Sequence, residues 1–218
     1  MEKKLAVIIG AGRGMGNHIA ERFAKENFCV VLVARRQSAL DEYTNEFHAK
    51  GYEVFTYAAD VFDTESLTKI FSDVQEKFGV VDVLIYNAAF MQGGRASELS
   101  AAEAVDHFKV DVAGAIHCVQ QVLAKQIERG EGAIIFTGGL FGVYPNANFN
   151  FACMSMDKAA LRSLAQMLNA SLKDKGIFVG IVQIMGVVGS NEHFAPKNIA
   201  DAYWRLYSDR NFFEYIFA

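Results

Sequence analysis

Short apolar runs alternate along the chain with longer segments in which apolar residues recur at helical spacing. The runs that we expect to form strands are Leu5–Ile9, Cys29–Ala34, Glu53–Ala58, Val81–Tyr86, Ala133–Thr137 and Phe178–Ile184, with Glu214–Phe217 as a short edge strand. The helical spacing falls on Met15–Glu26, Ser38–Lys50, Thr64–Phe78, Ala101–Arg129, Ala152–Asp174 and Pro196–Tyr207. This alternation is typical of an α/β fold, in which helices cover both faces of a doubly wound parallel sheet.

Composition narrows the class of protein. A chain of 218 residues can bury a full core, and nothing in it marks a boundary, so we expect a single domain over residues 1–218. No window approaches the ~20 apolar residues of a membrane span, and the first apolar run is too short for a secretory signal, which predicts a cytoplasmic location. A formal charge of −4 argues against nucleic-acid binding.

The three cysteines bear on redox state and metal binding. Cys29, Cys118 and Cys153 are odd in number, fall in expected strands or helices and lack metal-ligand spacing. We therefore expect them to be reduced and packed in the core, and we predict no metal site.

A glycine-rich turn follows the first apolar run directly and precedes an amphipathic helix. Its glycines are Gly10, Gly12, Gly14 and Gly16, and Arg13 and Met15 lie between them. Residues without a Cβ let the backbone approach a pyrophosphate, and the N–H groups of the next helix then face the anion. This strand–turn–helix setting predicts a dinucleotide site, the alternative being an ordinary tight turn.

The residues that follow the second and third strands indicate which dinucleotide is bound. A dinucleotide-binding fold normally has an acidic residue after the second strand, where it binds the ribose 2′-OH of NAD. Arg35 and Arg36 stand there instead, and with Arg13 they favour the 2′-phosphate of NADP(H) over NAD(H); the alternative is a pair of solvated surface arginines. Asp60 can accept a hydrogen bond from the adenine amino group, although it can equally cap the next helix, for which Asp63 is the better cap.

Several motifs together resemble the short-chain dehydrogenase/reductase family. They are the spacing of Gly10, Gly14 and Gly16, the pair Asp60-Val61, Asn87-Ala88-Ala89, the segment Val110–Gly114, the strand Ile134–Thr137 and the helical segment Lys158–Leu161. The resemblance runs almost end to end and implies a Rossmann fold. The cofactor-binding residues expected from the strand ends and the resemblance are Gly10, Gly12, Arg13, Gly14, Met15, Gly16, Arg35, Arg36, Asp60, Val61, Asn87, Ala88, Ala89, Lys158, Gly186 and Val188.

The family's catalytic pattern is only partly present. The resemblance implies a Tyr four residues before the Lys as proton donor, a Ser that orients the carbonyl, and an Asn that anchors a water. Lys158 keeps its context, but Met154, Gly139 and Asp111 occupy the other positions. A thioether and a glycine have no hydroxyl to offer. We expect Asp111 to pair with Lys158 and orient it.

A replacement acid is available nearby in the sequence. Tyr144 lies in the loop before the family's catalytic helix and carries a phenol whose pKa a neighbouring cation would lower. The alternative is a packing or surface role, which most loop tyrosines have. The candidate catalytic residues are therefore Lys158, Asp111 and Tyr144. After the sixth strand, the segment Met185–Ser190 keeps the family's glycine, and only Asn191–Ala195 separate it from the final helix. The lid that covers substrate in this family is therefore almost missing.

These expectations leave two functions open. The resemblance implies an NADP(H)-dependent oxidoreductase with an atypical active site, acting on an unknown small carbonyl or alcohol. The alternative is a catalytically silent NADP(H)-binding protein, such as a redox sensor or a non-catalytic subunit. Small residues on Ala101–Arg129 and Ala152–Asp174 favour close helix pairing, and the resemblance implies a homodimer or homotetramer; the alternative is packing within one chain.

Overall fold

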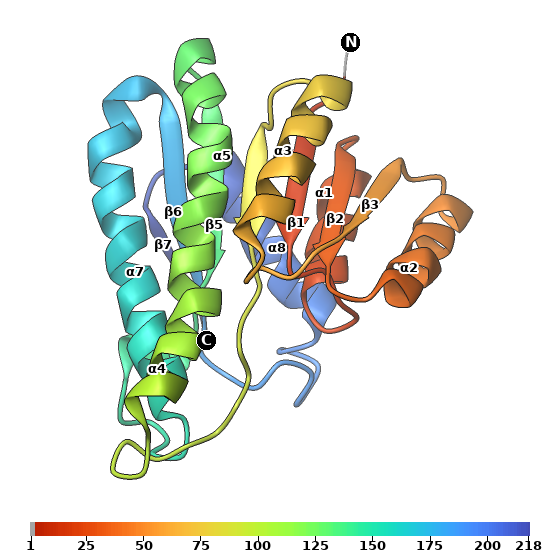
Figure 1. Ribbon diagram of the computed structural model, residues 1–218. Helices are drawn as coiled ribbons and strands as arrows, with labels where there is room; N and C mark the ends of the chain where they lie inside the picture. Colours follow the sequence, from red (N-terminus) through yellow and green to blue (C-terminus); the bar gives the residue numbers. More distant parts are fainter. Residues whose placement is uncertain (1–2) are drawn as a thin grey trace.

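Seven parallel strands form one sheet in the order β3-β2-β1-β4-β5-β6-β7 in the computed structural model, which describes residues 3–218 (Figure 1). The strands are β1 (Leu5–Ile9), β2 (Cys29–Ala34), β3 (Val54–Ala58), β4 (Val83–Tyr86), β5 (Gly132–Thr137), β6 (Ile177–Ile184) and β7 (Glu214–Phe217). The order reverses between β1 and β4. In open sheets of this kind, ligands bind at such a reversal, outside the carboxyl ends of the strands.

Helices cover both faces of the sheet, as the hydrophobic pattern predicts. They are α1 (Gly16–Lys25), α2 (Gln37–Ala49), α3 (Thr64–Phe78), α4 (Ala101–Phe108), α5 (Gly114–Arg129), α6 (Leu140–Val143), α7 (Ala152–Leu172) and α8 (Pro196–Asp209). One buried cluster joins the sheet to α3, α5 and α7, and a second joins it to α1, α2 and α8. None of the helices in the described part of the chain is both long and apolar enough to cross a lipid bilayer.

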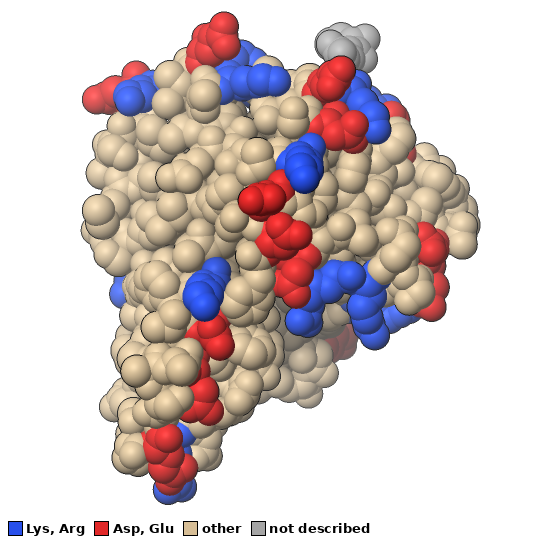
Figure 2. Space-filling view, viewed as in Figure 1, with Lys and Arg blue, Asp and Glu red and all other residues tan. Residues whose placement is uncertain are grey.

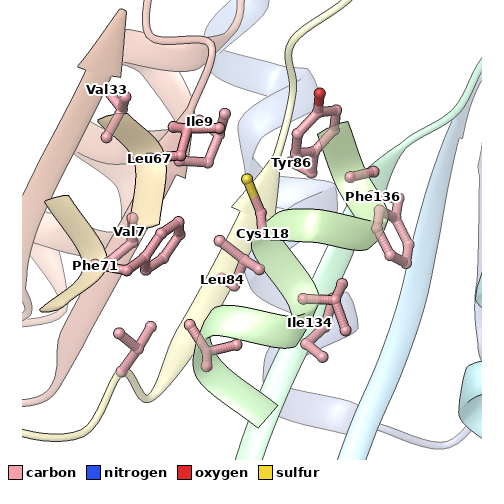
Figure 3. Close-up of a cluster of buried hydrophobic side chains, with 14 of the residues drawn as sticks. Val7, Ile9, Val33, Leu67, Phe71, Leu84, Tyr86, Cys118, Ile134 and Phe136 are labelled. Atoms are coloured by element: carbon pink, nitrogen blue, oxygen red, sulfur yellow. The ribbon is translucent and has the colours of Figure 1, made fainter. Parts of the chain in front are cut away.

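The cluster under α5 shows how the strands are buried (Figure 3). Cys118 of α5 lies over the sheet among Leu84, Tyr86 and Ile134, and all four side chains are fully or almost fully buried. Burial raises the pKa of the Cys118 thiol to about 12. The three cysteines are free and buried, so the prediction of core packing is confirmed.

The helix predicted over Ala101–Arg129 is present with these bounds, but its regular α-helical hydrogen bonding is interrupted. A π-helical turn at Lys109–Ala113 separates α4 from α5. The hydroxyl of Tyr86 donates a hydrogen bond to the Val110 carbonyl, and a Cβ at Gly114 would lie 2.6 Å from that hydroxyl oxygen. The Tyr86 side chain of β4 therefore contacts the helix at the turn where the hydrogen-bonding pattern changes from α to π. Turns of this kind occur frequently at functional sites.

Candidate functional site

A cavity of about 810 Å³ opens at the carboxyl ends of the strands, next to the β1/β4 reversal. Its walls come from the loops that follow six strands, and it extends from Arg35 after β2 to Lys158 on α7. The size is within the range of small-molecule and cofactor sites. The predicted cofactor residues that line it are Gly10, Gly14, Met15, Arg35, Asp60, Val61, Asn87, Ala88, Ala89, Lys158, Gly186 and Val188.

The glycine turn has the shape that a dinucleotide requires. Gly10 has φ +87°, and a Cβ there would lie 2.5 Å from the Ala88 nitrogen, while a Cβ at Gly16 would lie 2.5 Å from the Gly10 carbonyl oxygen. These two glycines allow the tight turn and the close approach of α1. Gly14 lines the cavity, and no atom lies within 4 Å of the position of its absent Cβ. The turn therefore leaves open space where a pyrophosphate would meet the backbone.

The three predicted arginines do not converge. Arg35 is exposed and lines the cavity, but Arg36 lies at the start of α2, outside the lining. Arg13 forms ion pairs of 2.8 Å and 3.0 Å with Glu42 and Glu46 of α2. Figure 2 shows basic side chains gathered at the lower right of the molecule with acidic ones beside them. These ion pairs hold the Arg13 side chain outside the cavity lining, although its position in the glycine turn predicts contact with the cofactor.

The two aspartates after β3 have separate roles. Asp63 caps α3 by accepting a 2.9 Å hydrogen bond from the Ser66 N–H, which confirms the predicted cap. Asp60 lines the cavity, and one carboxylate oxygen accepts a 3.1 Å hydrogen bond from the Phe62 N–H. Asp60 is therefore not needed as a helix cap, and its carboxylate lies at the cavity wall.

The predicted pairing of Lys158 with Asp111 is present at the other end of the cavity. Lys158 Nζ donates a 2.8 Å hydrogen bond to the Thr137 carbonyl and lies 4.0 Å from Asp111 Oδ1. Asp111 belongs to the π-helical turn, and its Oδ2 accepts a 2.8 Å hydrogen bond from the Phe90 N–H. Burial lowers the pKa of the lysine and raises the pKa of the carboxyl group.

A chain of hydrogen bonds holds the strand ends together beside this pair. Thr137 Oγ1 accepts from the Tyr203 hydroxyl at 2.7 Å and donates to Asn87 Oδ1 at 3.0 Å, and Asn87 Nδ2 donates to the Gly10 carbonyl at 2.9 Å. Thr137 is the one residue with a hydroxyl group in the cavity lining, as far as residues 3–218 are concerned. Since its proton is already directed at Asn87, it is not free to donate to a ligand.

Apolar groups dominate the cavity wall near Lys158. Met154 and Gly139, the residues that the sequence analysis set against the family's Tyr and Ser, both line the cavity. The Gly139 N–H donates a 2.7 Å hydrogen bond to Oε1 of Gln183, which is fully buried. The other apolar side chains at this end are Phe90, Met91, Leu140, Phe141 and Phe151.

Tyr144 does not reach this site. It follows α6, a short helix that the sequence pattern did not predict, and it is 56% exposed and lies outside the cavity lining. The structure thus separates Tyr144 from Lys158 and does not favour it as the replacement acid.

Two buried residues next to this site were not singled out by sequence reasoning. His107 and Asp157 lie with Asp111, and one ligand-type atom from each is within 4.8 Å of the others. Burial raises the pKa of Asp157 to about 7. The signal in the sequence was their spacing, because His107 precedes Asp111 by one helical turn and Asp157 directly precedes Lys158.

Comparisons with known proteins agree with this geometry. The chain is 32% identical to the ketoacyl reductase HetN of Nostoc over 179 residues, and the match covers 82% of this chain and 62% of HetN. It is 29% identical over 215 residues to an uncharacterized oxidoreductase of Staphylococcus saprophyticus, covering 93% of this chain and 90% of that protein. The match therefore spans less than two thirds of HetN but most of the second relative.

Solved structures share the fold. An actinorhodin polyketide ketoreductase with NADPH superposes with a TM-score of 0.90 at 23% identity, covering 99% of this chain and 97% of that one. A metagenomic short-chain oxidoreductase in complex with NADP gives a TM-score of 0.88 at 24% identity, with coverages of 99% and 97%. Residues 4–196 match the short chain dehydrogenase family as a whole. The chain therefore belongs to the short-chain dehydrogenase family.

Proposed function

We propose that this protein is an NADP(H)-dependent oxidoreductase with an atypical active site, which acts on a small carbonyl or alcohol. One observation carries the proposal: a single cavity joins the glycine turn, Arg35 and Lys158. These are the groups needed at the phosphate end, the ribose end and the nicotinamide end of a dinucleotide. Family membership supports a nicotinamide cofactor.

The preference for NADP(H) rests on Arg35. It lines the cavity after β2 and is exposed, and no ion pair engages it in the part of the chain that the structure describes. Its guanidinium is free to form two parallel hydrogen bonds with a 2′-phosphate. Two solved relatives of similar fold are complexes with NADPH or NADP, which supports the same choice.

The chemistry at the reactive end falls to Lys158 and Asp111. When bound, the cofactor supplies or accepts a hydride. Lys158 lines the cavity, where its ammonium would hydrogen-bond the nicotinamide ribose and hold a water next to the substrate oxygen, while Asp111, 4.0 Å away and outside the lining, orients the lysine. That water would be the proton source, because Met154 has no proton to give.

One observation favours a second function, which is the binding of NADP(H) without turnover. The Thr137 hydroxyl, the single hydroxyl of the lining within residues 3–218, donates to Asn87 and is therefore not available as an acid. A protein that binds NADP(H) without turnover would have the same site. Such a protein would act as a redox sensor or as a non-catalytic subunit.

Two measurements test the proposal. Fluorescence titration with NADPH and with NADH should show tighter binding of NADPH, and equal or tighter binding of NADH would overturn the Arg35 argument. Oxidation of NADPH is then followed over a panel of small carbonyl compounds. Slow but measurable turnover supports the enzyme, whereas tight NADPH binding with no turnover on any compound supports the silent binder.

We also propose that the protein forms a homodimer or homotetramer through the face covered by α4, α5 and α7. Figure 2 shows few charged side chains over α5 and α7. Large apolar residues are exposed on these helices, namely Val105, Phe108, Ile116, Met156 and Met167. Light scattering coupled to size exclusion should give a mass that is a multiple of the chain mass, and Met167→Glu should reduce it.

A further inference from the structure

A second group of polar side chains lies behind Lys158, outside the lining of the large cavity. His107 comes from the end of α4, Asp111 from the π-helical turn and Asp157 from α7. Their side chains are almost completely buried, with exposures of 3%, 1% and 3%. One ring nitrogen and one oxygen from each carboxylate all lie within 4.8 Å of one another. Three separate elements thus direct ligand-type atoms to one point.

Each of the three residues has an unsatisfied polar atom. His107 Nδ1, Asp111 Oδ1 and Asp157 Oδ2 are buried and have no hydrogen-bond partner among the described residues. The nearest cation to Asp111 Oδ1 is Lys158 Nζ, at 4.0 Å, and that nitrogen donates to the Thr137 carbonyl instead. Buried polar atoms without hydrogen-bond partners are costly and rare. A bound group that satisfies all three atoms together would remove this cost.

The remaining atoms of the group are held in fixed orientations. The Phe90 N–H donates to Asp111 Oδ2, which leaves Oδ1 without a hydrogen-bond partner. The ring of Phe90 lies 4.3 Å from the His107 ring, centroid to centroid, and fixes its plane. Metal sites use such neighbouring groups to orient their ligands.

We propose that His107, Asp111 and Asp157 bind a divalent transition-metal cation, with Zn²⁺ as the best match. One imidazole nitrogen and two carboxylate oxygens are ordinary zinc ligands. Bonds of about 2.0–2.2 Å in a tetrahedral site place neighbouring ligand atoms roughly 3.3–3.6 Å apart, so atoms that lie within 4.8 Å of one another must approach by up to about 1.5 Å through side-chain rotation to close the site. Three protein ligands leave a fourth position for water. The proposed site differs from the expectation of no metal site, which rests on the spacing of the cysteines alone.

A route to the site exists. A smaller cavity of about 190 Å³ is lined by His107 and Cys153, and it also carries the carboxylates of Glu98 and Glu103 together with Arg95. His107 therefore faces this small cavity as well as the carboxylates of Asp111 and Asp157. An entry path is one of the features that a genuine metal site must have.

The experiment measures metal binding directly and needs no nucleotide. The full chain is stripped with a chelator and titrated with Zn²⁺ by calorimetry and with Co²⁺ by visible absorption. We expect one ion per chain, a raised Tm, and a Co²⁺ spectrum with nitrogen and oxygen ligands. Asp157→Asn and His107→Gln keep the size of each side chain and should weaken binding at least about tenfold.

Asp106→Asn is the matched control, because Asp106 is the exposed neighbour of His107 and pairs with Lys109 at 2.9 Å. It should bind metal as the wild type does. Failure of the wild type to bind Zn²⁺ or Co²⁺ overturns the proposal, as does equal binding by all variants. If the wild type binds no metal and Asp157→Asn raises the Tm, the carboxyl groups of Asp111 and Asp157 share a proton instead. None of these results depends on NADP(H) binding or turnover.

Discussion

The two ends of the large cavity are built differently. At the glycine turn, Gly10 and Gly16 are in contacts that no Cβ would allow, and Gly14 leaves the space that a dinucleotide needs. At the Lys158 end, Met154 and Gly139 line the wall and carry no hydroxyl group. One end is shaped by its backbone, while the other depends on which functional groups its side chains carry.

This difference shows that binding and turnover place separate demands on the same fold. A turn that binds pyrophosphate depends on backbone shape, which a few glycines determine. Proton transfer depends on one functional group at one position, and a single substitution removes it. Variants at each end therefore test whether nucleotide binding and turnover depend on one another.

Restoring the hydroxyl groups should have the largest effect. The double variant Met154→Tyr, Gly139→Ser should raise the rate of carbonyl reduction by about 10²–10⁴, the usual contribution of a positioned acid. Gly139 has φ 177°, which any residue adopts, and the nearest atom to an added Cβ is the Ile184 carbonyl oxygen at 3.6 Å. Steady-state kinetics with NADPH measures the change. An unchanged rate with intact NADPH binding would mean that the two ends differ in more than the missing hydroxyls.

Closing the open space at the glycine turn should have the next largest effect. Gly14→Leu should weaken NADPH binding by about 100-fold, or roughly 2.8 kcal/mol, because the side chain would fill the pyrophosphate position. Since no atom lies within 4 Å of the Cβ position, the fold should be kept, and Tm should change little. Gly14→Ala is the graded control, with a smaller loss. Normal binding by Gly14→Leu would move the dinucleotide away from this turn.

Local patterns explain why the binding end could be predicted from the sequence. β1 and α3 have the predicted bounds, and β1, the glycine turn and α1 are continuous in the chain, so their geometry depends on neighbouring residues. The reactive end is assembled from distant segments. Tyr86 of β4 donates a hydrogen bond into the π-helical turn that carries Asp111. At the binding end, the placement of Arg13 is missed for the same reason, because its partners Glu42 and Glu46 lie in α2. None of these partners is visible in a local pattern.

Removing the cavity arginine should separate the two nucleotides. Arg35→Ala should weaken NADPH binding by about tenfold, since a hydrogen bond to a charged group contributes about 1.5–3 kcal/mol and solvent exposure reduces it. NADH binding should change little. Arg13→Ala is the matched control, because Arg13 pairs with Glu42 at 2.8 Å outside the cavity lining. Fluorescence titration measures the affinity of each variant for NADPH and NADH. A larger loss of NADPH affinity in Arg13→Ala than in Arg35→Ala would mean that Arg13 turns toward the nucleotide.

The smallest effect should come from weakening the hydrogen bonds that link Gly139 through Gln183 to Glu214. Gln183 Nε2 donates to Glu214 Oε1 at 2.9 Å, and Arg162 donates two hydrogen bonds, of 2.7 Å and 2.9 Å, to the same carboxylate. Glu214→Gln should lower the free energy of unfolding at neutral pH by about 1 kcal/mol, because the partly exposed arginine is screened by solvent. NADPH affinity should not change. Glu53→Gln, which breaks an exposed 3.0 Å pair with Lys3, is the control and should have a smaller effect.

The pH dependence identifies the cause of this stability difference. Hydrogen bonding from Arg162 holds the pKa of Glu214 below its ordinary value in the folded protein. Its stabilisation is therefore complete above the unfolded-state pKa of about 4.3 and is lost as pH falls through the lower folded pKa. Urea unfolding of wild type and Glu214→Gln should differ most at neutral pH, and the two should converge in acid. A constant difference would assign the loss to packing around Gln183, and a parallel loss of NADPH affinity would mean that the two ends of the cavity are coupled through Gly139.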